Sequence, residues 1–320
     1  MIRLAIDVMG GDHGIAPLVA GAVRALQENP ELHLTLVGDA CQLESCLLDN
    51  SYSGRIKIEE ASEIVGMEDN PLEALRNKQS SSMAKALDLV VDDKVDGVVS
   101  AGNTGALVAF SVNKIGMAEG VSRPAICTQM PNPNGRTWLL DLGATLVATE
   151  DRLLELARLG SSQCRIYNRI KKPRVGLLNV GVEAGKGGEE LQLASDRLAA
   201  ESEFEYCGYV EGSSIFSESI DVVVCDGFSG NVAIKTAQGV AQLIVAKFSN
   251  LDGLGWLDRL RLWLAAPALK QIGRQLDPTL YNGAPLLGLR RLVVKSHGSA
   301  NKRGFANAIL LAAQTAEQEL

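Results

Sequence analysis

The sequence contains few aromatic and few histidine side chains, and these two shortages argue against particular classes of function. Phenylalanine, tryptophan and tyrosine make up 4% of the 320 residues, which is sparse for a protein that stacks nucleobases. A net charge of -7 also argues against a general nucleic-acid binder. The only histidines are His13, His33 and His297, and no HExxH pattern occurs. The sequence therefore has few histidines that could coordinate a zinc ion. We expect neither a nucleic-acid partner nor a bound metal.

Cysteine pairs and long apolar runs are also missing. The six cysteines have no CxxC spacing, which favours reduced thiols in the cytoplasm. No window reaches the ~18 to 20 uncharged apolar residues that cross a bilayer, and the N-terminus lacks the pattern of a secretory signal. We therefore expect a soluble, cytoplasmic protein that at most sits on a membrane surface.

What the sequence does contain is a regular alternation of apolar β-type runs and amphipathic stretches of helical length. The predicted strands span residues 4–8, 32–37, 55–59, 97–99, 136–140, 174–180, 221–225 and 292–294. The predicted helices span residues 17–27, 71–91, 104–115, 150–159, 231–248 and about 305–319. This pattern predicts an α/β fold with a mostly parallel sheet that helices cover on both faces.

The loops that follow the predicted strands are rich in glycine and small polar residues. In an open parallel sheet, ligands bind beyond the carboxyl ends of the strands, where free N–H groups at a helix start attract anions. Three loops supply candidate phosphate- or substrate-binding residues: Gly10, Gly11, Asp12 and His13; Ser100, Asn103 and Thr104; and Asp226, Ser229 and Gly230. We expect the last two loops to lie on one sheet edge and to share one site. A glycine turn without a ligand, or a helix cap at Asn103 or Thr104, is the alternative.

Two further loops carry side chains suited to chemistry. Lys186 lies between Gly185, a further candidate phosphate- or substrate-binding residue, and two more glycines. It therefore presents a flexible charge that suits a phosphate or a developing oxyanion. His297 follows a predicted strand and lies near Lys295, which places a titratable ring beside a cation. A solvated loop lysine and a structural histidine are the plain alternatives. Because GxSxG is absent, we expect a substrate such as inorganic phosphate, and not a serine, to supply the nucleophile. GxGxxG and GxxxxGK[ST] are also absent, which argues against a dinucleotide or nucleoside-triphosphate site.

Residues 251–303 have nine basic and three acidic side chains in a chain that is otherwise acidic. Leucine and isoleucine repeat there at helical spacing on both sides of Pro267, and Trp256 and Trp263 lie a heptad apart. The pattern predicts a protruding amphipathic helical pair at about 251–277. This pair would contact a membrane surface or an acyl chain, unless it forms a dimer or core interface, the commoner role of an apolar stripe. The positive charge favours an acidic partner.

Nine segments, taken in order, resemble those of the phosphate acyltransferase family that makes acyl phosphate from acyl-acyl carrier protein. They are AIDVMGGDHG at 5–14, SAGNTGAL at 100–107, RPA at 123–125, LLDLGA at 139–144, PRVGLLNVG at 173–181, GKG at 185–187, DVVVCDGFSGN at 221–231, YNGAPLLGL at 281–289 and VKSHGSA at 294–300. The resemblance covers nearly the whole chain and implies a single α/β domain over 1–320. The implied fold is a Rossmann-like α/β/α arrangement of three layers, related to the isocitrate and isopropylmalate dehydrogenases and to the phosphate acetyltransferases.

The resemblance also implies an activity and partners. The reaction is reversible transfer of a fatty acyl group from acyl carrier protein to inorganic phosphate, at the entry to bacterial phospholipid synthesis, without a metal or organic cofactor. A homodimer, loose membrane association and a membrane glycerol-3-phosphate acyltransferase as the next enzyme are implied as well. Joined with the loop chemistry, the resemblance points to Lys186, Asn231 and His297 as catalytic residues. Lys186 and Asn231 would stabilise the oxyanion, and His297 or Asp226 would pass a proton to the leaving thiol.

Two places depart from the family pattern, and three other functions stay open. Thr145 stands where an asparagine usually follows LLDLGA, and Val182-Glu183-Ala184 stands where consecutive glutamates are frequent. The rival functions are a CoA-dependent phosphate acyltransferase, an NAD-linked decarboxylating dehydrogenase and a non-catalytic, membrane-docked scaffold for lipid enzymes. The dehydrogenase needs a nucleotide loop that the sequence lacks, and a scaffold has no need of the strand-end loops that carry Lys186 and His297.

Overall fold

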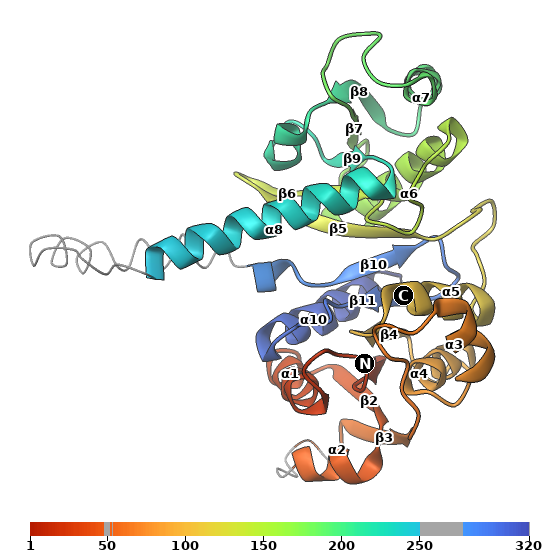
Figure 1. Ribbon diagram of the computed structural model, residues 1–320, viewed down its shortest axis with the longest axis vertical. Helices are drawn as coiled ribbons and strands as arrows, with labels where there is room; N and C mark the ends of the chain where they lie inside the picture. Colours follow the sequence, from red (N-terminus) through yellow and green to blue (C-terminus); the bar gives the residue numbers. More distant parts are fainter. Residues whose placement is uncertain (48–51, 53, 250–277, 320) are drawn as a thin grey trace, which may run out of the picture.

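A sheet of eleven strands forms the middle layer of the described part of the chain (Figure 1). The computed structural model describes residues 1–47, 52, 54–249 and 278–319. The strands are β1 Ile2–Asp7, β2 Leu32–Gly38, β3 Ile56–Glu60, β4 Gly97–Ser100, β5 Ala125–Asn132, β6 Gly135–Leu140, β7 Arg174–Leu178, β8 Glu205–Val210, β9 Val222–Val224, β10 Ala284–Leu287 and β11 Leu292–Lys295. The helices are α1 Ile15–Glu28, α2 Ala40–Cys46, α3 Pro71–Asn77, α4 Ser82–Val91, α5 Thr104–Lys114, α6 Glu150–Asn168, α7 Glu189–Ala199, α8 Gly227–Ser249 and α10 Lys302–Glu319, with the short 3-10 helices η2 Gly212–Phe216 and η3 Pro278–Tyr281.

The strand order divides the sheet into two halves that run in opposite directions. The order is β3-β2-β1-β4-β11-β10-β5-β6-β9-β7-β8. The first five strands are parallel to one another, and so are the last four. Between them, β10 is antiparallel to β11 and to β5, and β5 is antiparallel to β6. The mostly parallel sheet of the predicted α/β class is therefore confirmed, with a reversal of direction near its middle.

This reversal corrects the expectation that the loops after Ser100 and Val224 lie on one sheet edge. Lys295, at the end of β11, pairs with Ala284 at the start of β10, whereas Leu140, at the end of β6, pairs with Cys127 near the start of β5. The carboxyl ends of the two halves consequently lie at opposite edges of the sheet. Apolar periodicity predicts which strands are buried, but it does not predict the direction of each neighbour.

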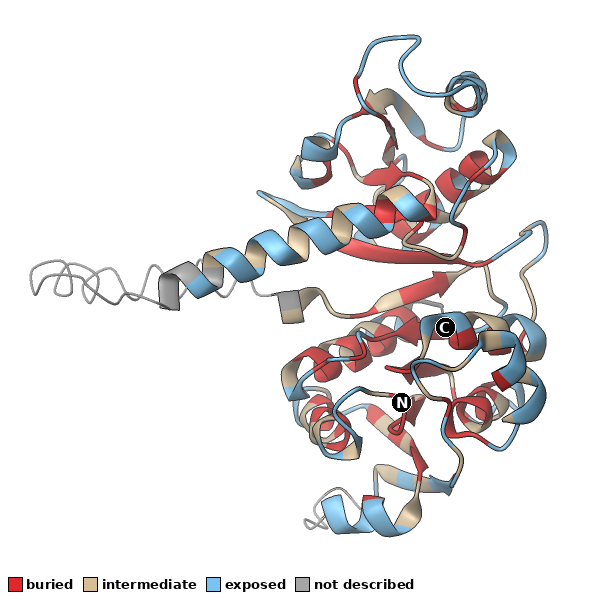
Figure 2. Ribbon diagram, in the orientation of Figure 1, coloured by how far each residue is buried: buried red, intermediate tan, exposed pale blue. Residues whose placement is uncertain are grey.

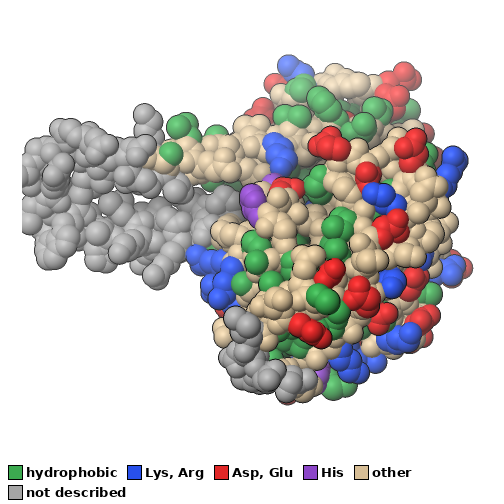
Figure 3. Space-filling view, turned by 60° about the horizontal axis from the view of Figure 1, so that its bottom comes forward, with side chains coloured by type: hydrophobic (Ala, Val, Ile, Leu, Met, Phe, Trp, Pro, Cys, Tyr) green, Lys and Arg blue, Asp and Glu red, His purple; other side chains and the backbone are tan. Residues whose placement is uncertain are grey.

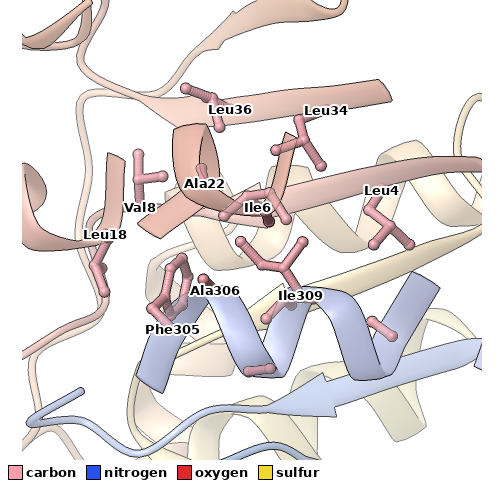
Figure 4. Close-up of a cluster of buried hydrophobic side chains, with 14 of the residues drawn as sticks. Leu4, Ile6, Val8, Leu18, Ala22, Leu34, Leu36, Phe305, Ala306 and Ile309 are labelled. Atoms are coloured by element: carbon pink, nitrogen blue, oxygen red, sulfur yellow. The ribbon is translucent and has the colours of Figure 1, made fainter. Parts of the chain in front are cut away.

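The core lies on both faces of the sheet because the central strands are apolar on both faces (Figure 2). In the first half, Leu4 and Ile6 of β1 pack with Leu34 of β2 against α1 and α10 (Figure 4). The two helices approach closely at Gly21, where a Cβ would lie 2.9 Å from the Cβ of Phe305. A second cluster covers the other face of this half through α4 and α5, and two more clusters enclose the second half.

The predicted strands are all present, but one predicted helix is wrong. Residues 71–91 form two helices, α3 and α4, rather than one. The break comes from local side-chain bonds: Ser81 accepts a hydrogen bond from the backbone N–H of Ala84 and so begins α4, while the Lys78 ammonium binds the Asp69 carboxylate at 2.6 Å. Helices α2 and α7 and strands β5, β8 and β10 were not expected. The helical pair predicted at about 251–277 lies outside the described residues.

Helix α8 begins at the end of β9, crosses in front of the sheet and projects beyond it (Figure 1). It starts at Gly227, four residues earlier than the predicted Asn231. Its first turn packs on the loop after β6, because Gly227 donates a backbone hydrogen bond of 2.8 Å to Thr145 and Gly230 lies against the carbonyl oxygen of Asp141. The glycines of this segment thus serve close backbone packing.

This packing gives a stability prediction. A Cβ on Gly230 would overlap the carbonyl oxygen of Asp141, so we expect Gly230→Ala to lower the free energy of unfolding by about 1–3 kcal/mol. At Gly239, in the same helix, a Cβ would have no described atom within 4 Å. Gly239→Ala should therefore stabilise the helix by up to about 1 kcal/mol. Urea denaturation of both variants checks the pair, and equal effects would contradict the packing argument.

Candidate functional site

Asp7 is a buried carboxylate at the carboxyl end of β1, and three donors hold it. The hydroxyl groups of Ser82 and Ser100 donate hydrogen bonds of 2.7 and 2.6 Å, and the backbone N–H of Met9 donates one of 3.3 Å. Burial raises the pKa of Asp7, while the bonds from Ser100, Ser82 and Met9 and the charge of Lys295 oppose that shift. Through these hydrogen bonds the carboxylate holds α4 and the loops after β1 and β4 together.

Three strand-end loops of the first half lock together around Asp7. A Cβ on Gly10 would lie 2.7 Å from the Cα of Gly102, so the first two loops touch through bare backbone. The backbone N–H of Asp12 donates to the carbonyl of Gly298 at 2.9 Å, and that of Ser296 donates to Ser100 at 2.8 Å. The structure thus brings the predicted loops 10–13, 100–104 and 295–299 to the same sheet edge. His13 is exposed beside them.

Lys295 is a buried cation in the middle of these loops. Its side chain is 8% exposed, and its ammonium donates to the carbonyl of Ala101 at 3.3 Å and to that of Ser296. Burial lowers the pKa of Lys295 to about 8, with Lys235 acting in the same direction and Asp12 and Asp7 opposing it. Burial of a lysine ammonium costs stability unless the charge is paired and hydrogen-bonded, and groups with such shifted pKa values gather at functional sites.

The pKa of Lys295 gives a stability prediction with a definite sign. The folded value of about 8 lies below the reference value of 10.5. Between about pH 8 and 10.5, the unfolded chain therefore binds more protons at this side chain than the folded protein does, and the free energy of unfolding rises with pH. Asp7, Asp12 and Lys235 are the charged groups that face it.

The test of this prediction is a comparison with Lys295→Met, because other groups also titrate in that window. We expect the difference in unfolding free energy, wild type minus variant, to increase from pH 8 to pH 10 in urea denaturation. A difference that stays flat or falls with pH would show that Lys295 is not desolvated in the folded protein.

His297 lies at the surface of the same loops and meets a side chain from the second half. Its Nε2 is 3.1 Å from the Lys235 Nζ of α8. Its Nδ1 accepts a hydrogen bond from the backbone N–H of Ser299 at 3.2 Å and lies 2.9 Å from the Ser299 hydroxyl oxygen. Burial lowers the pKa of His297, as do the charges of Lys235 and Lys295, while Asp12 opposes them. Asn282 fixes the loop by accepting from the His297 backbone N–H at 2.9 Å.

Helix α8 therefore connects the two edges of the sheet. It begins at the carboxyl end of β9 and, two turns later, brings Lys235 to the carboxyl end of β11. Asn231 lies four residues before Lys235 and is exposed, so the two side chains share one face of the helix. In the space-filling view, histidine and Lys or Arg side chains lie near one another where the projecting helix meets the body (Figure 3).

The start of α5 has free donors, although its polar side chains are already engaged. Asn103 caps the helix by accepting from the N–H of Ala106 at 3.0 Å, and its amide group donates to the carbonyls of Met67 and Asp69. The cap predicted at Asn103 is confirmed. No described group accepts from the backbone N–H of Thr104 or Gly105, so these two donors could receive an anion.

At the start of α8, in contrast, oxygen atoms of the protein accept the hydrogen bonds of the backbone N–H groups. The backbone N–H groups of Gly227 and Phe228 donate to the carbonyls of Thr145 and Leu146 at 2.8 and 3.2 Å. The N–H of Ser229 donates to the Asp226 carboxylate at 2.7 Å. The expectation of an anion cradle built from these N–H groups is therefore wrong, because the N–H groups have partners within the chain.

Lys186 lies on the loop after β7, in the second half. The loop is held by Asn179, whose amide group donates to the Lys186 carbonyl at 3.0 Å, and it turns at Gly185 and Gly187, both of which have positive φ angles. The Lys186 side chain is exposed, and no described residue forms an ion pair or hydrogen bond with its ammonium. The described part of the chain therefore does not join Lys186 to the loops around Asp7.

Comparison with known proteins places the chain in a family. The family model described as "Fatty acid synthesis protein" matches residues 2–320. A "Phosphate acyltransferase" from Marinobacter nauticus is 44% identical over 319 residues, which cover 100% of this chain and 93% of that protein. The chain belongs to the phosphate acyltransferase family. It is an acyltransferase.

Solved structures that share the fold of this chain include more distant proteins. A phosphotransacetylase from Streptococcus pyogenes has a TM-score of 0.65 and 15% identity, covering 99% of this chain and 94% of that one. A 4-hydroxythreonine-4-phosphate dehydrogenase from Klebsiella pneumoniae has a TM-score of 0.54 and 15% identity, covering 99% and 98%. At such identities the likeness shows the fold alone, and it agrees with the predicted fold class.

Sequence reasoning did not select Asp7, Ser82, Lys235 or Lys295 as site residues of this chain. Asp7 had a signal, because it is the one charged residue in the apolar run 4–8 and lone buried charges are rare. Lys295 had a similar signal, because it is a charged residue directly after the apolar run 292–294. Lys235 is 62 residues from His297 in the sequence, and only the path of α8 brings the two together.

Thr145, the departure from the family pattern, is buried with an unpartnered hydroxyl. Its backbone N–H donates to the Asp141 carboxylate at 2.7 Å, and its carbonyl accepts from Gly227, so the main chain is fixed whatever the side chain. Within the described ranges, no three His, Cys, Asp or Glu side chains are placed to hold a metal ion. Nor is any helix in those ranges long and apolar enough to cross a membrane.

Proposed function

We propose that this protein transfers a fatty acyl group from acyl-acyl carrier protein to inorganic phosphate, giving acyl phosphate and the free carrier-protein thiol. The observation that carries the proposal is the cluster of two lysines and one histidine at one sheet edge: Lys235 of α8 with Lys295 and His297 at the end of β11. Such a cluster suits a phosphate dianion. Names such as that of the Marinobacter relative, "Phosphate acyltransferase", support phosphate as the acceptor.

The buried cysteines and the two serines bound to Asp7 do not compete with phosphate as nucleophiles. Burial raises the pKa values of the Cys127, Cys164 and Cys225 thiols, which keeps them protonated and unreactive. Ser82 and Ser100 are fully buried and bound to Asp7. A phosphate oxygen therefore attacks the thioester carbonyl directly, and the site supplies orientation and charge.

In the proposed reaction, the new C–O bond to phosphate forms and the C–S bond of the thioester breaks. Lys186 and Asn231 stabilise the negative oxygen of the tetrahedral intermediate. The departing sulfur takes up a proton, and His297 is the better of the two predicted donors. Asp226 is less suited, because its carboxylate accepts the N–H of Ser229 as the cap of α8.

An apolar patch at the start of α8 supports a fatty acyl group as the transferred unit. Leu146 and Val147 are 63% and 84% exposed, and Phe228 is 64% exposed. Phe228 and Leu146 are joined by a backbone hydrogen bond of 3.2 Å, so these side chains come from neighbouring segments. Val180 and Val182, on the loop of Lys186, are 81% and 63% exposed. Exposed apolar side chains in such a group mark a binding surface.

The carrier protein, as an acidic donor, suits the basic stretch 251–303, of which residues 278–303 are described. We also propose a cytoplasmic homodimer loosely attached to the membrane, where a membrane glycerol-3-phosphate acyltransferase consumes the product. The sequence pattern of 251–277 supports the attachment.

The donor is tested by release of free thiol from palmitoyl-acyl carrier protein and from palmitoyl-CoA, each with and without phosphate. We expect phosphate-dependent release from the carrier protein and little from CoA. Release from CoA alone would make the protein a CoA-dependent phosphate acyltransferase. Release from neither would favour the scaffold.

A further inference from the structure

The environment of His297 assigns its tautomer. Its Nδ1 receives the backbone N–H of Ser299, which can only donate. Burial and the charges of Lys235 and Lys295 lower the pKa of His297, which favours the neutral ring. A neutral ring carries one proton, and because Nδ1 is an acceptor, this proton lies on Nε2.

The Nε2–H group and the Lys235 ammonium are then two donors at 3.1 Å with no acceptor between them. An ammonium also offers donors only. Among the described residues, no Asp or Glu forms an ion pair with Lys235 or Lys295. Asp7 is occupied by Ser82, Ser100 and Met9. Asp12, whose charge acts on Lys295 and His297, has no hydrogen bond to either Lys235 or His297 among the described contacts. An oxygen atom of an external anion satisfies both donors at once.

We infer that a phosphate oxyanion binds between Lys235 Nζ and His297 Nε2, which makes Lys235 a phosphate-binding residue supplied by the second half to the loops of the first. The inference rests on the proposed function and moves the phosphate away from the filled start of α8. Lys295 lies behind the site as a buried positive charge. The free N–H groups of Thr104 and Gly105 lie on the loop that Lys295 contacts through Ala101.

This position suits the reaction because it joins a nucleophile to a proton donor. A phosphate held by Lys235 contacts the His297 ring and favours its charged form, the imidazolium that is proposed to protonate the leaving thiol. Asn231 lies one turn earlier on the same helix face, where it can meet the carbonyl oxygen of the thioester. The site therefore spans the two halves, and α8 sets the distance between its parts.

The chain's three histidines make a direct binding experiment practical. We propose to follow the ring resonances of His13, His33 and His297 by NMR while inorganic phosphate is added, using His297→Asn to assign the signal. Binding at the inferred site shifts the His297 signals and raises its pKa, because an adjacent anion favours the charged ring. His33, on β2, should not respond.

The matched variants are Lys235→Gln, Lys235→Arg and, as a control for net charge, Lys94→Gln. We expect Lys235→Gln to weaken phosphate binding by about 10- to 100-fold, as for loss of a charge-assisted hydrogen bond. Lys235→Arg should restore part of the affinity, and Lys94→Gln, on an exposed side chain, should bind as wild type does. In kinetics, Lys235→Gln should raise the KM for phosphate more than that for the acyl donor.

The outcomes separate the inference from the proposed function. An unchanged His297 signal at saturating phosphate, or normal phosphate affinity in Lys235→Gln, overturns the inference even if acyl transfer is intact. A response to 4′-phosphopantetheine but not to inorganic phosphate also overturns it, because the site would then hold the donor's arm. Phosphate binding at His297 without any acyl transfer supports the inference and contradicts the proposed function.

Discussion

Replacing Lys186 by alanine is expected to lower turnover by about 100-fold or more, the usual loss when one oxyanion-stabilising group is removed. The side chain is exposed and no described residue pairs with it, so its removal should leave the unfolding curve unchanged. The loop keeps its shape through main-chain features: the bond from Asn179 and the positive φ angles of Gly185 and Gly187. The loss should therefore appear in kcat, measured by thiol release with saturating phosphate.

A control for this experiment is Lys172→Ala, another exposed lysine in the second half. It changes the net charge equally but lies outside the loops assigned to the site, so its activity should match that of the wild type. Near-normal turnover in Lys186→Ala would remove Lys186 from the mechanism. A comparable loss in both variants would mean that overall charge, and not the position of Lys186, controls the rate.

Asp141→Ala is expected to destabilise the protein by about 3 kcal/mol or more. The Asp141 carboxylate is fully buried and accepts four backbone N–H groups, from Ile126, Gly143, Ala144 and Thr145, at 2.7 to 3.3 Å. Each buried donor left without a partner costs about 1–3 kcal/mol. The loop after β6, on which α8 begins, would lose its support.

Asp141→Asn separates the hydrogen bonds from the rest of the side chain. The amide keeps one acceptor oxygen, which can retain the three bonds of Oδ1 but not that of Oδ2 to Thr145. We expect it to cost about 1–3 kcal/mol, less than alanine. Unfolding in urea compares the two. A loss below about 1 kcal/mol in Asp141→Ala would contradict the role of this carboxylate as the organiser of the loop.

Much of the fold was predictable because a run of apolar residues indicates a buried strand. The run 222–224 is apolar throughout and forms the fully buried β9. The reversal of the sheet was not predictable in the same way, since it depends on β10, a strand of four residues that contains Pro285. The strands on either side decide whether such a strand lies parallel or antiparallel. The apolar pattern of one segment does not show which strands these are.

The candidate site was predictable loop by loop but not as an assembly. The glycines at 10 and 102 mark a place where two backbones touch, and glycine in a strand-end loop is a sequence signal. The anion cradle predicted from the glycines at 227 and 230 was wrong. Glycine also occurs where a helix packs closely against another loop, as α8 does here, so the two cases cannot be told apart from the sequence. The meeting of Lys235 with His297 depends on the direction and length of α8, which are tertiary properties.

The central claim is that inorganic phosphate is the acyl acceptor, and product identification tests it most directly. Wild-type protein would be incubated with palmitoyl-acyl carrier protein and labelled phosphate, and the lipid product separated and analysed. The account predicts labelled palmitoyl phosphate in amounts equal to the thiol released, with no release when phosphate is omitted. Free palmitate formed without phosphate, or thiol release with no labelled acyl phosphate, would contradict it.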